Sequence, residues 1–413
     1  MRFLLLPAYF SLALPLLAEN WPTWRGPRGD GVTNETNLPL TWSATEGVRW
    51  KVALPERGNS SPIVWGDRIF LTQNAGDRRT IICLDRKDGH TLWQAGPEWK
   101  EKDTTHPTNP YCSASPSTDG ERVIAWFGSA GLWCWTLDGK EQWHVDLGRQ
   151  NHIWGYAASP VLQGDLCILN FGPGERSFIV AVDKRTGKEA WRFTPPPPAT
   201  REGPGAASAG SWNTGIVADI GGRKEYIVSL PGAVFSLDPQ TGKELWHCNG
   251  LNPLTYADPI IGDGVIGGFG GYNGYSLAVK TGGSGDITAT HRLWQEKTNP
   301  QRIGTSIAVG KHAWLNSALG IVECIELDTG KSLWKERLGA GGGSGSWSSY
   351  VRSGDRIYAV TQGSDVVIFK ASPEKYEQLA VNSMRDGHTN CSLAVSDGQL
   401  FLRTDKHLWC IGK

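Results

Sequence analysis

The chain consists largely of short apolar, β-branched and aromatic runs, each ended within a few positions by glycine, aspartate or asparagine. Residues 61–71 show the unit, in which Ser-Pro-Ile-Val-Trp is followed by a Gly-Asp turn and a second apolar run. Such a pattern predicts two short β-strands joined by a tight turn. The same form returns at 159–169 and 258–266, and looser copies start near Ser115, Trp212, Ser306, Ser349 and Ser392, which makes eight units. Helical periodicity is nowhere sustained, so we expect almost no α-helix.

A second pattern recurs later in each unit, where a turn is followed by a tryptophan. Residues 84–93, 182–191 and 237–246 each place an acidic residue, a glycine and then a tryptophan at matching positions, and 326–334 is a fourth copy. The tryptophans of the series are Trp50, Trp93, Trp143, Trp191, Trp246, Trp294 and Trp334. A repeat of about 40–55 residues is typical of propeller blades rather than of helical repeats.

Eight units of four strands predict an all-β protein, an eight-bladed β-propeller of four-stranded antiparallel blades. The last unit, 393–411, supplies only three strands, whereas an extra strand at 48–52 precedes the first unit. Pairing that strand with the C-terminal blade closes the ring and leaves no open edge. We therefore expect a signal peptide at 1–18, an extended segment at 19–46 and the propeller at 47–413.

The N-terminal residues indicate export. Met1-Arg2, an apolar stretch to Leu17 and then Ala18 are typical of a secretory signal peptide cleaved after residue 18. The stretch contains two prolines and is too short for a membrane anchor. No lipid-modified cysteine follows it, so we expect a periplasmic or secreted protein without a transmembrane segment. The 41 basic and 41 acidic residues balance, which argues against a nucleic-acid partner.

The eight cysteines do not form a disulfide pattern. Cys83, Cys134, Cys324 and Cys410 occupy the same third-strand position of four different blades. Equivalent positions in different blades lie too far apart, because a disulfide needs α-carbons within about 7 Å. We therefore expect buried thiols, and the lack of a Cys-x-x-Cys pair gives structural zinc no support.

The repeated turns ending in tryptophan resemble those of the pyrroloquinoline-quinone (PQQ) propeller superfamily. This superfamily includes the quinoprotein alcohol dehydrogenases and BamB of the outer-membrane assembly machinery. The opening Trp21-Pro22-Thr23-Trp24-Arg25-Gly26-Pro27 and residues 58–62 are similar to exported bacterial propellers annotated only as PQQ-like. The resemblance covers 48–413 and implies that the seven tryptophans of the series wedge between adjacent blades, a structural role.

Candidate binding residues lie near the start of each inner strand, on the face that carries the long blade-to-blade loops. The set comprises Asn59, His106, Tyr111, His152, Trp154, Tyr156, Trp212, Asn213, Tyr256, Asp258, Arg302, Trp347, His388 and Asn390. Inner strands converge on the axis of a propeller, so these side chains can surround one funnel. Aromatic planes with hydrogen-bonding groups suit a planar or sugar-like ligand. The alternative is that they seal the channel mouth.

Two functions fit this set. The favoured one is a non-enzymatic scaffold, without cofactor, metal or catalytic residue, that binds an envelope protein, an extended peptide or a glycan. The alternative, implied by the resemblance, is a PQQ-dependent dehydrogenase using calcium, with Asp258 as base and Asn213 or Asn390 as a metal ligand. The chain lacks the two adjacent cysteines of many such enzymes and any carboxylate-rich cluster for a hard cation. The glycine-rich 267–271 is expected to be a flexible loop.

Overall fold

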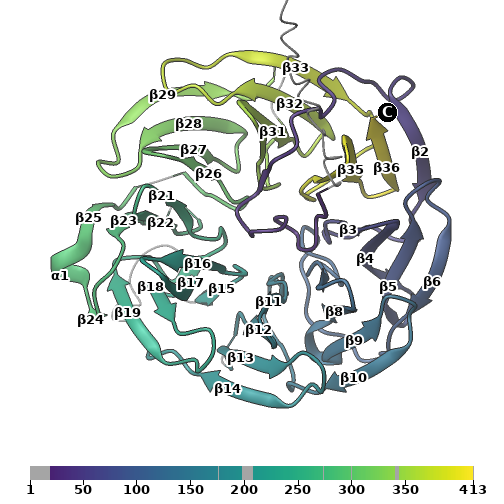
Figure 1. Cartoon of the computed structure of the whole chain (residues 1–413), viewed down its shortest axis with the longest axis horizontal. Coiled ribbons are helices and arrows are strands. Elements are labelled where there is room, and N and C mark those ends of the chain that lie inside the picture. The colour runs from purple at the N-terminus through teal and green to yellow at the C-terminus, as the bar shows by residue number, and fades with distance from the viewer. Residues whose placement is uncertain are drawn as a thin grey trace, which may run out of the picture.

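The computed structural model describes residues 19–174, 176–197, 208–272, 274–298, 300–339 and 344–412, so the expected signal peptide lies outside the described residues. The described chain forms eight small sheets arranged in a ring around a central axis (Figure 1). Its helices are one 3-10 turn, Gly128–Ala130, and α1, Thr288–His291. The prediction of an all-β, eight-bladed propeller is confirmed. No described helix is long and apolar enough to cross a membrane.

Blades 1 to 4 follow one another along the chain. Blade 1 consists of β3 (Ile63–Trp65), β4 (Arg68–Ala75), β5 (Arg78–Asp85) and β6 (Thr91–Ala95); blade 2 of β7 (Ser117–Thr118), β8 (Arg122–Trp126), β9 (Leu132–Thr136) and β10 (Glu141–Val145). Blade 3 consists of β11 (Val161–Gln163), β12 (Leu166–Phe171), β13 (Phe178–Asp183) and β14 (Glu189–Phe193). Blade 4 consists of β16 (Ile216–Ile220), β17 (Arg223–Leu230), β18 (Ala233–Leu237) and β19 (Glu244–Asn249), to which β24 (Gly285–Asp286) adds.

Blades 5 to 8 complete the ring. Blade 5 consists of β21 (Ile260–Gly262), β22 (Val265–Phe269), β23 (Ser276–Lys280) and β25 (Arg292–Glu296); blade 6 of β26 (Ile307–Val309), β27 (His312–Asn316), β28 (Ile321–Glu326) and β29 (Ser332–Arg337). Blade 7 consists of β30 (Val351–Ser353), β31 (Arg356–Val360), β32 (Asp365–Lys370) and β33 (Gln378–Ser383), and β1 (Val32–Thr33) pairs with its inner strand. Blade 8 consists of β34 (Ala394–Ser396), β35 (Gln399–Arg403), β36 (His407–Gly412) and β2 (Val48–Ala53). A separate bridge joins β15 (Gly210–Ser211) to β20 (Leu254–Thr255).

The two ends of the chain share blade 8. Strand β2 pairs antiparallel with β36, from Val48 opposite Ile411 to Ala53 opposite His407. The expected ring closure is therefore present, and it covers the polar edge that β36 would otherwise expose.

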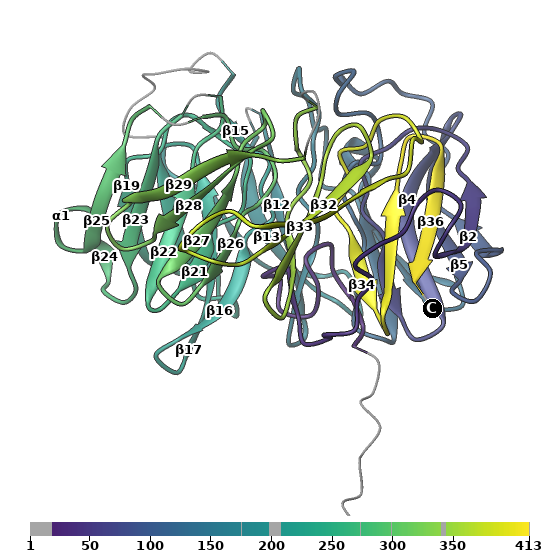
Figure 2. The ribbon, with the colours of Figure 1, turned by 90° about the horizontal axis from the view of Figure 1, so that it is seen from above.

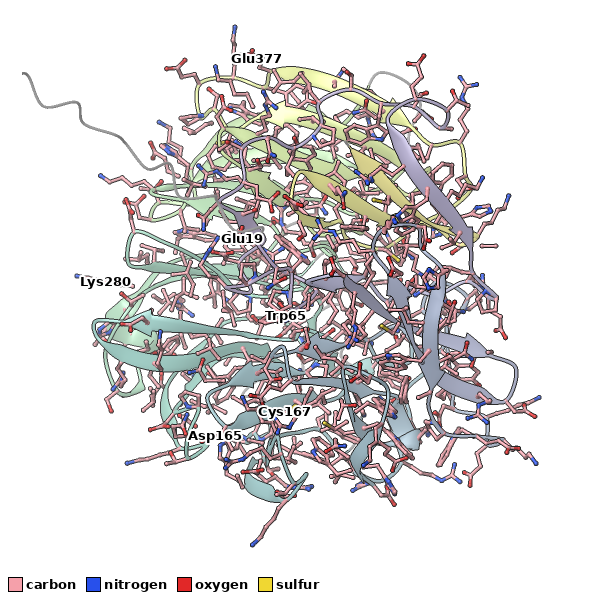
Figure 3. The ribbon with its side chains drawn as sticks, turned by 45° about the vertical axis from the view of Figure 1, so that its right-hand side comes forward. Glu19, Trp65, Asp165, Cys167, Lys280 and Glu377 are labelled. Atoms are coloured by element: carbon pink, nitrogen blue, oxygen red, sulfur yellow. The ribbon has the colours of Figure 1, made fainter. Side chains whose placement is uncertain are left out.

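The hydrophobic core lies between the blades. Each sheet presents apolar side chains on both faces, and the buried clusters join neighbours: one combines Ile124 of blade 2 with Leu169 of blade 3, and another Ile168 of blade 3 with Val228 of blade 4. A blade on its own would leave both of its apolar faces in water, so each blade is stable only when the neighbouring blades are present. Cys167, labelled in Figure 3, is fully buried in such a layer.

Six of the seven tryptophans in the series form a hydrogen bond with the following blade. Their indole N–H groups donate to main-chain oxygens there: Trp50 to Arg86, Trp93 to Leu137, Trp143 to Lys184, Trp191 to Pro239, Trp294 to Leu327 and Trp334 to Ser372. Five of these rings also lie against a turn glycine with positive φ; at Gly242, for example, a Cβ would come within 2.3 Å of the Trp191 ring. Trp246 differs, because it donates to Glu225 of its own blade.

The ring has two distinct faces. The turn face carries the short turns between first and second strands and between third and fourth strands of each blade. The long-loop face carries the blade-to-blade connections. The first part of residues 19–46 lies on the turn face, where the dark purple segment is at the bottom of Figure 2, and enters the axis. The segment then passes to the outside of the ring, where Leu40 and Trp42 bond Asn382 of β33.

Ring closure by β2 predicts a specific result for two truncations. A chain starting at residue 54 lacks β2, whereas one starting at 47 keeps it. The shorter chain exposes the edge of β36 and should aggregate or melt well below the longer one, since each kcal/mol shifts the melting temperature of a domain by at least about 2 °C. Thermal unfolding followed by circular dichroism compares the two. Equal melting temperatures would contradict closure by β2.

All eight cysteines are free and buried. Burial raises the pKa of Cys83, Cys112, Cys134, Cys324 and Cys410 to about 12, so almost no thiolate exists at pH 8. We predict slow reaction with a disulfide reagent in the native state and titration of eight thiols in denaturant. Fewer than six thiols in denaturant would show that disulfides form.

Candidate functional site

The axis is surrounded by a closed circle of hydrogen bonds, which we call the axial ring. Each blade contributes one residue just before its inner strand: Ser61, Ser115, Ser159, Thr214, Asp258, Thr305, Ser349 and Ser392. The backbone N–H of each donates to the side-chain oxygen of the next, at 2.6–3.0 Å, and Ser392 donates back to Ser61. All eight are at least 95% buried. The ring fixes the eight inner strands at one height around the axis.

Residues 20–38 form a hairpin that enters this axis from the turn face. Trp21 pairs with Val64 of blade 1, and after a turn at 25–31 the strand β1 returns alongside β30. The carboxylate of Glu35 then accepts the backbone N–H groups of Asp397 and Gly398 in a turn of blade 8. The hairpin therefore closes the channel on one side and carries Trp24 near its tip.

The hairpin places one cation beneath the one acidic member of the ring. Arg25 is buried and donates to the carbonyls of Asp30, Thr305 and Ser306. Burial lowers its pKa to about 10, and the charges of Asp258 and Asp30 oppose that shift, so the guanidinium stays protonated at neutral pH. Burial raises the pKa of Asp258 to about 6, against the opposing effects of Arg25 and of two backbone N–H groups.

Above the ring, a cavity of about 430 Å³ opens on the long-loop face. Its aromatic lining residues are Trp24, Trp154, Trp212, Tyr256, Tyr272 and Trp347. Its amide side chains are Asn59, Asn109, Asn213, Gln301 and Asn390, and hydroxyls of the axial ring lie below them. Among the described lining residues Asp258 is the one carboxylate, and none is lysine or arginine.

Nine of the fourteen residues predicted from the sequence line this cavity. They are Asn59, His106, Trp154, Trp212, Asn213, Tyr256, Asp258, Trp347 and Asn390. They come from every blade-to-blade connection except the one before blade 6, which contributes Gln301 and Ile303 instead. The sequence thus located most of the cavity wall, although whether these residues bind a ligand stays a prediction.

The other five predicted residues lie elsewhere. Tyr156 is buried against Trp126, and Arg302 is buried in an ion pair with Glu323 at 3.1 Å. His152 packs behind the wall, edge-on to Trp212, and burial lowers its pKa, which favours the neutral imidazole.

Tyr111 and His388 sit outside the cavity for different reasons. Tyr111 lines a neighbouring cavity of about 400 Å³ and supports the guanidinium of Arg79, 3.7 Å above its ring. His388 is part-exposed beside Gln362 and Asp405. Placing all fourteen around one funnel was therefore wrong for these five, because the local backbone turns their side chains into the blades or away from the axis.

Two aromatic lining residues were missed in the sequence. Trp24 lies more than 30 positions before the first blade and reaches the cavity only because the hairpin threads the axis. Tyr272 follows the glycine-rich 267–271, which was expected to be a flexible loop; Gly267 to Phe269 belong instead to β22. Tyr272 is 48% exposed and stacks on Trp154, with ring centroids 5.9 Å apart.

The lining residues do not fit PQQ with calcium. Calcium requires six to eight oxygen ligands, including carboxylates. Oδ1 of Asp258 already accepts the N–H groups of Thr214 and Gly215, at 2.6 and 3.1 Å. Oδ1 of Asn213 has no donor among the described residues, but a neutral amide oxygen does not replace the carboxylates that calcium requires. PQQ carries three carboxyl groups, and the described lining residues include no lysine or arginine to pair with them; His106 is the one imidazole there.

One possible metal-ligand cluster exists in the described chain, and it lies elsewhere. Asp85, Asp88 and His90 have ligand atoms within 4.8 Å of one another. They occupy an exposed turn of blade 1, on the turn face, where Asp88 caps the N–H of His90 and bonds its ring. Such hydrogen bonds are ordinary turn structure.

A family model described as outer membrane protein assembly factor BamB matches residues 32–173 and 175–413. The chain belongs to this family. Among curated relatives, the BamB of Alkalilimnicola ehrlichii is 24% identical over 213 residues, which is 51% of this chain and 37% of that protein. The quinohemoprotein alcohol dehydrogenase ADH-IIG of Pseudomonas putida is 29% identical over 175 residues, 39% of this chain and 22% of that enzyme. The chain thus spans well under two thirds of either relative.

Solved structures show the same fold as this BamB-family chain. The BamB of Moraxella catarrhalis superposes with a TM-score of 0.60 and 15% identity, covering 87% of this chain and 98% of that one. The quinohemoprotein alcohol dehydrogenase of Comamonas testosteroni gives 0.67 and 13%, covering 95% and 81%. At these identities the likeness establishes the fold alone.

Because the Asp258 carboxyl is buried, we predict that the effect of replacing it on the free energy of unfolding depends on pH. Its folded-state pKa of about 6 lies above the ordinary 3.8, so its contribution to stability is largest below pH 4 and is lost as pH rises toward 6. Asp258→Asn keeps an oxygen acceptor but does not titrate. We predict that the stability of the variant relative to the parent rises by about 3 kcal/mol between pH 3.5 and 7.

Urea unfolding at both pH values measures this difference. Asp88→Asn, at an exposed turn, is the control and should not reproduce the gain. If the free energy of unfolding of Asp258→Asn relative to the parent stayed constant or fell as the pH rose, the raised pKa of Asp258 would be contradicted.

Proposed function

We propose that this BamB-family protein is an exported, non-enzymatic scaffold that binds a protein or an extended peptide on its long-loop face. Export rests on the signal-peptide pattern of residues 1–18, which is consistent with a periplasmic or secreted protein. The known members named above as outer membrane assembly factors make an envelope protein the natural partner.

The observation that carries the proposal is that the Asp258 carboxylate is hydrogen-bonded within the axial ring. It is the one carboxylate among the described lining residues, and the axial ring uses its Oδ1 to hold blade 4 against blade 5. A general base needs a free acceptor within hydrogen-bonding reach of the substrate. The two backbone donors on Oδ1 give this carboxylate a structural role and leave only Oδ2 as an acceptor for a substrate.

Exposed apolar side chains on the long-loop face support docking. Ile153, Tyr272 and Leu319 are exposed by 55%, 48% and 65%, all three lie in loops of this face, and Tyr272 also lines the cavity. Large exposed apolar side chains are typical of protein-binding surfaces. The turn face offers mainly short turns of glycine, aspartate and lysine.

A quinohemoprotein-like dehydrogenase is the second candidate, favoured by the sequence similarity to ADH-IIG. It would use PQQ and calcium in the same cavity. The lining described above argues against it, because the described lining residues include no lysine or arginine for PQQ and a single carboxylate for calcium.

Site-specific photo-crosslinking tests the binding face. A photoreactive residue in place of Leu319 probes the long-loop face. One in place of the exposed Lys224, near the start of β17 and the β16–β17 turn of blade 4, probes the turn face. We predict a discrete protein adduct in the cell envelope from position 319 and none from 224. Adducts from 224 alone, or from neither position, would contradict docking on the long-loop face.

A dye-linked assay tests the rival function. Purified protein incubated with PQQ and calcium should not reduce the dye in the presence of alcohols or aldoses. Turnover above that of the heat-denatured sample, abolished by chelator, would establish the dehydrogenase and overturn the non-enzymatic assignment.

A further inference from the structure

We propose that the axial cavity binds an uncharged saccharide, either a short oligosaccharide or the end of a longer chain. The inference deepens the function proposed above, because it rests on the long-loop face being the binding face. It does not depend on which protein docks on that face.

One wall of the cavity is a continuous aromatic surface. Trp154 stacks on Tyr272 and lies against Trp212, with ring centroids 5.9 Å apart in both pairs. Trp212 in turn meets Tyr256 edge-on at 5.0 Å. Rings held against one another lose little freedom when a ligand binds. Their faces suit the C–H faces of a sugar ring, which are apolar although the ring edge is polar.

The remaining wall consists of amide and hydroxyl groups. Asn59, Asn109 and Asn390 are linked through hydrogen bonds to one another or to the carbonyl of Thr108, which fixes their positions. Each amide combines a donor and an acceptor, the pair of functions that a sugar hydroxyl also has. Most of these amide groups are occupied within the network, including Nδ2 of Asn109 and Oδ1 of Asn390. Among the described lining residues, Oδ1 of Asn59 and the amide of Gln301 are left to exchange hydrogen bonds with ligand hydroxyls.

Asn213 supplies an independent observation. It is 99% buried in the cavity lining, and its Nδ2 points to the Ser229 carbonyl, which can only accept. The orientation of the amide is thus fixed, and its Oδ1 has no hydrogen-bond donor among the described residues. A buried acceptor without a donor costs about 1–3 kcal/mol. The oxygen is covered by protein atoms, so a ligand hydroxyl can satisfy it only where the lining shifts to admit that hydroxyl.

Charge and shape narrow the ligand class. The lining has no lysine or arginine among its described residues, and Asp258 is the one carboxylate, so nothing favours an anionic sugar. Among the described residues, the hairpin with Trp24 lines the turn-face end of the cavity, so we take the ligand to enter from the long-loop face. A chain cannot pass through, so the cavity takes a chain end or a short saccharide and not an internal segment.

Calorimetric titration with a defined panel tests the proposal. The uncharged probes are maltotriose, cellotriose and triacetylchitotriose, and the anionic probe is trigalacturonic acid. We expect at least one uncharged probe to bind with a dissociation constant of about 1 mM or lower and the anionic probe to bind at least 10-fold more weakly. Tryptophan fluorescence should change on binding, because four lining residues are tryptophans.

Variants locate the site. Trp154→Ala and Gln301→Ala should each weaken binding at least 10-fold, whereas Trp133→Ala should not. Trp133 is a matched control, a half-buried tryptophan stacked on His144 of blade 2 outside the cavity. Trp154 uses only its backbone N–H and carbonyl in hydrogen bonds within the described chain, so alanine leaves these in place. Trp154→Phe should retain part of the affinity.

Three results would overturn the proposal: no binding by any uncharged probe at about 10 mM, binding unaffected by both cavity variants, or tighter binding of the anionic probe. To separate chain ends from internal segments, soluble linear dextrin is compared with a cyclodextrin, which has no ends; the linear form should bind and the cyclic form should not. A negative titration with a positive crosslink at 319 would reject the saccharide and leave the protein scaffold intact.

Discussion

The structure depends on a closed circle of eight hydrogen bonds around its axis, in which each backbone N–H is received by a side chain of the next blade. A propeller blade cannot bury both of its faces alone, so the arrangement is decided between blades and not within them. The axial ring fixes the positions of the inner strands relative to one another, and the indole hydrogen bonds fix the position of each outer strand against the next blade. Between these two layers the long-loop connections are held at fixed distances, which is why residues hundreds of positions apart form one cavity wall.

The N-terminal hairpin converts this ring from a channel into a blind cavity. The hairpin contributes Trp24, which lines the turn-face end of the cavity, and Arg25, whose positive charge lies beneath Asp258. The cation offsets part of the penalty of burying a carboxylate, and the carboxylate in turn accepts two backbone donors that a hydroxyl would serve less well. What remains exposed to a ligand is neutral, aromatic and rich in amides, a chemistry that favours recognition over catalysis.

The fold followed from local patterns, and the site followed from them only in part. Strand-turn-strand runs and the recurring tryptophans are short-range signals, so the eight blades and the closure by β2 could be predicted. Tyr156 and Arg302 stand at equally suggestive positions, yet each turns into a blade because a buried partner, Trp126 or Glu323, lies there. Trp24 could not be predicted, since its position depends on the path of a segment without periodicity. The glycines of β22 were taken for a loop, although at Gly268 a Cβ would lie 2.5 Å from Val234 of the adjacent blade.

A crystal structure of the protein with a bound uncharged trisaccharide tests the central claim most directly, because it shows the hairpin and the ligand together. The account predicts a terminal sugar ring between the Trp154 face and the amide wall, with Trp24 beneath it. A sugar bound on the turn face or the outer strands, or a hairpin displaced from the axis, would contradict it.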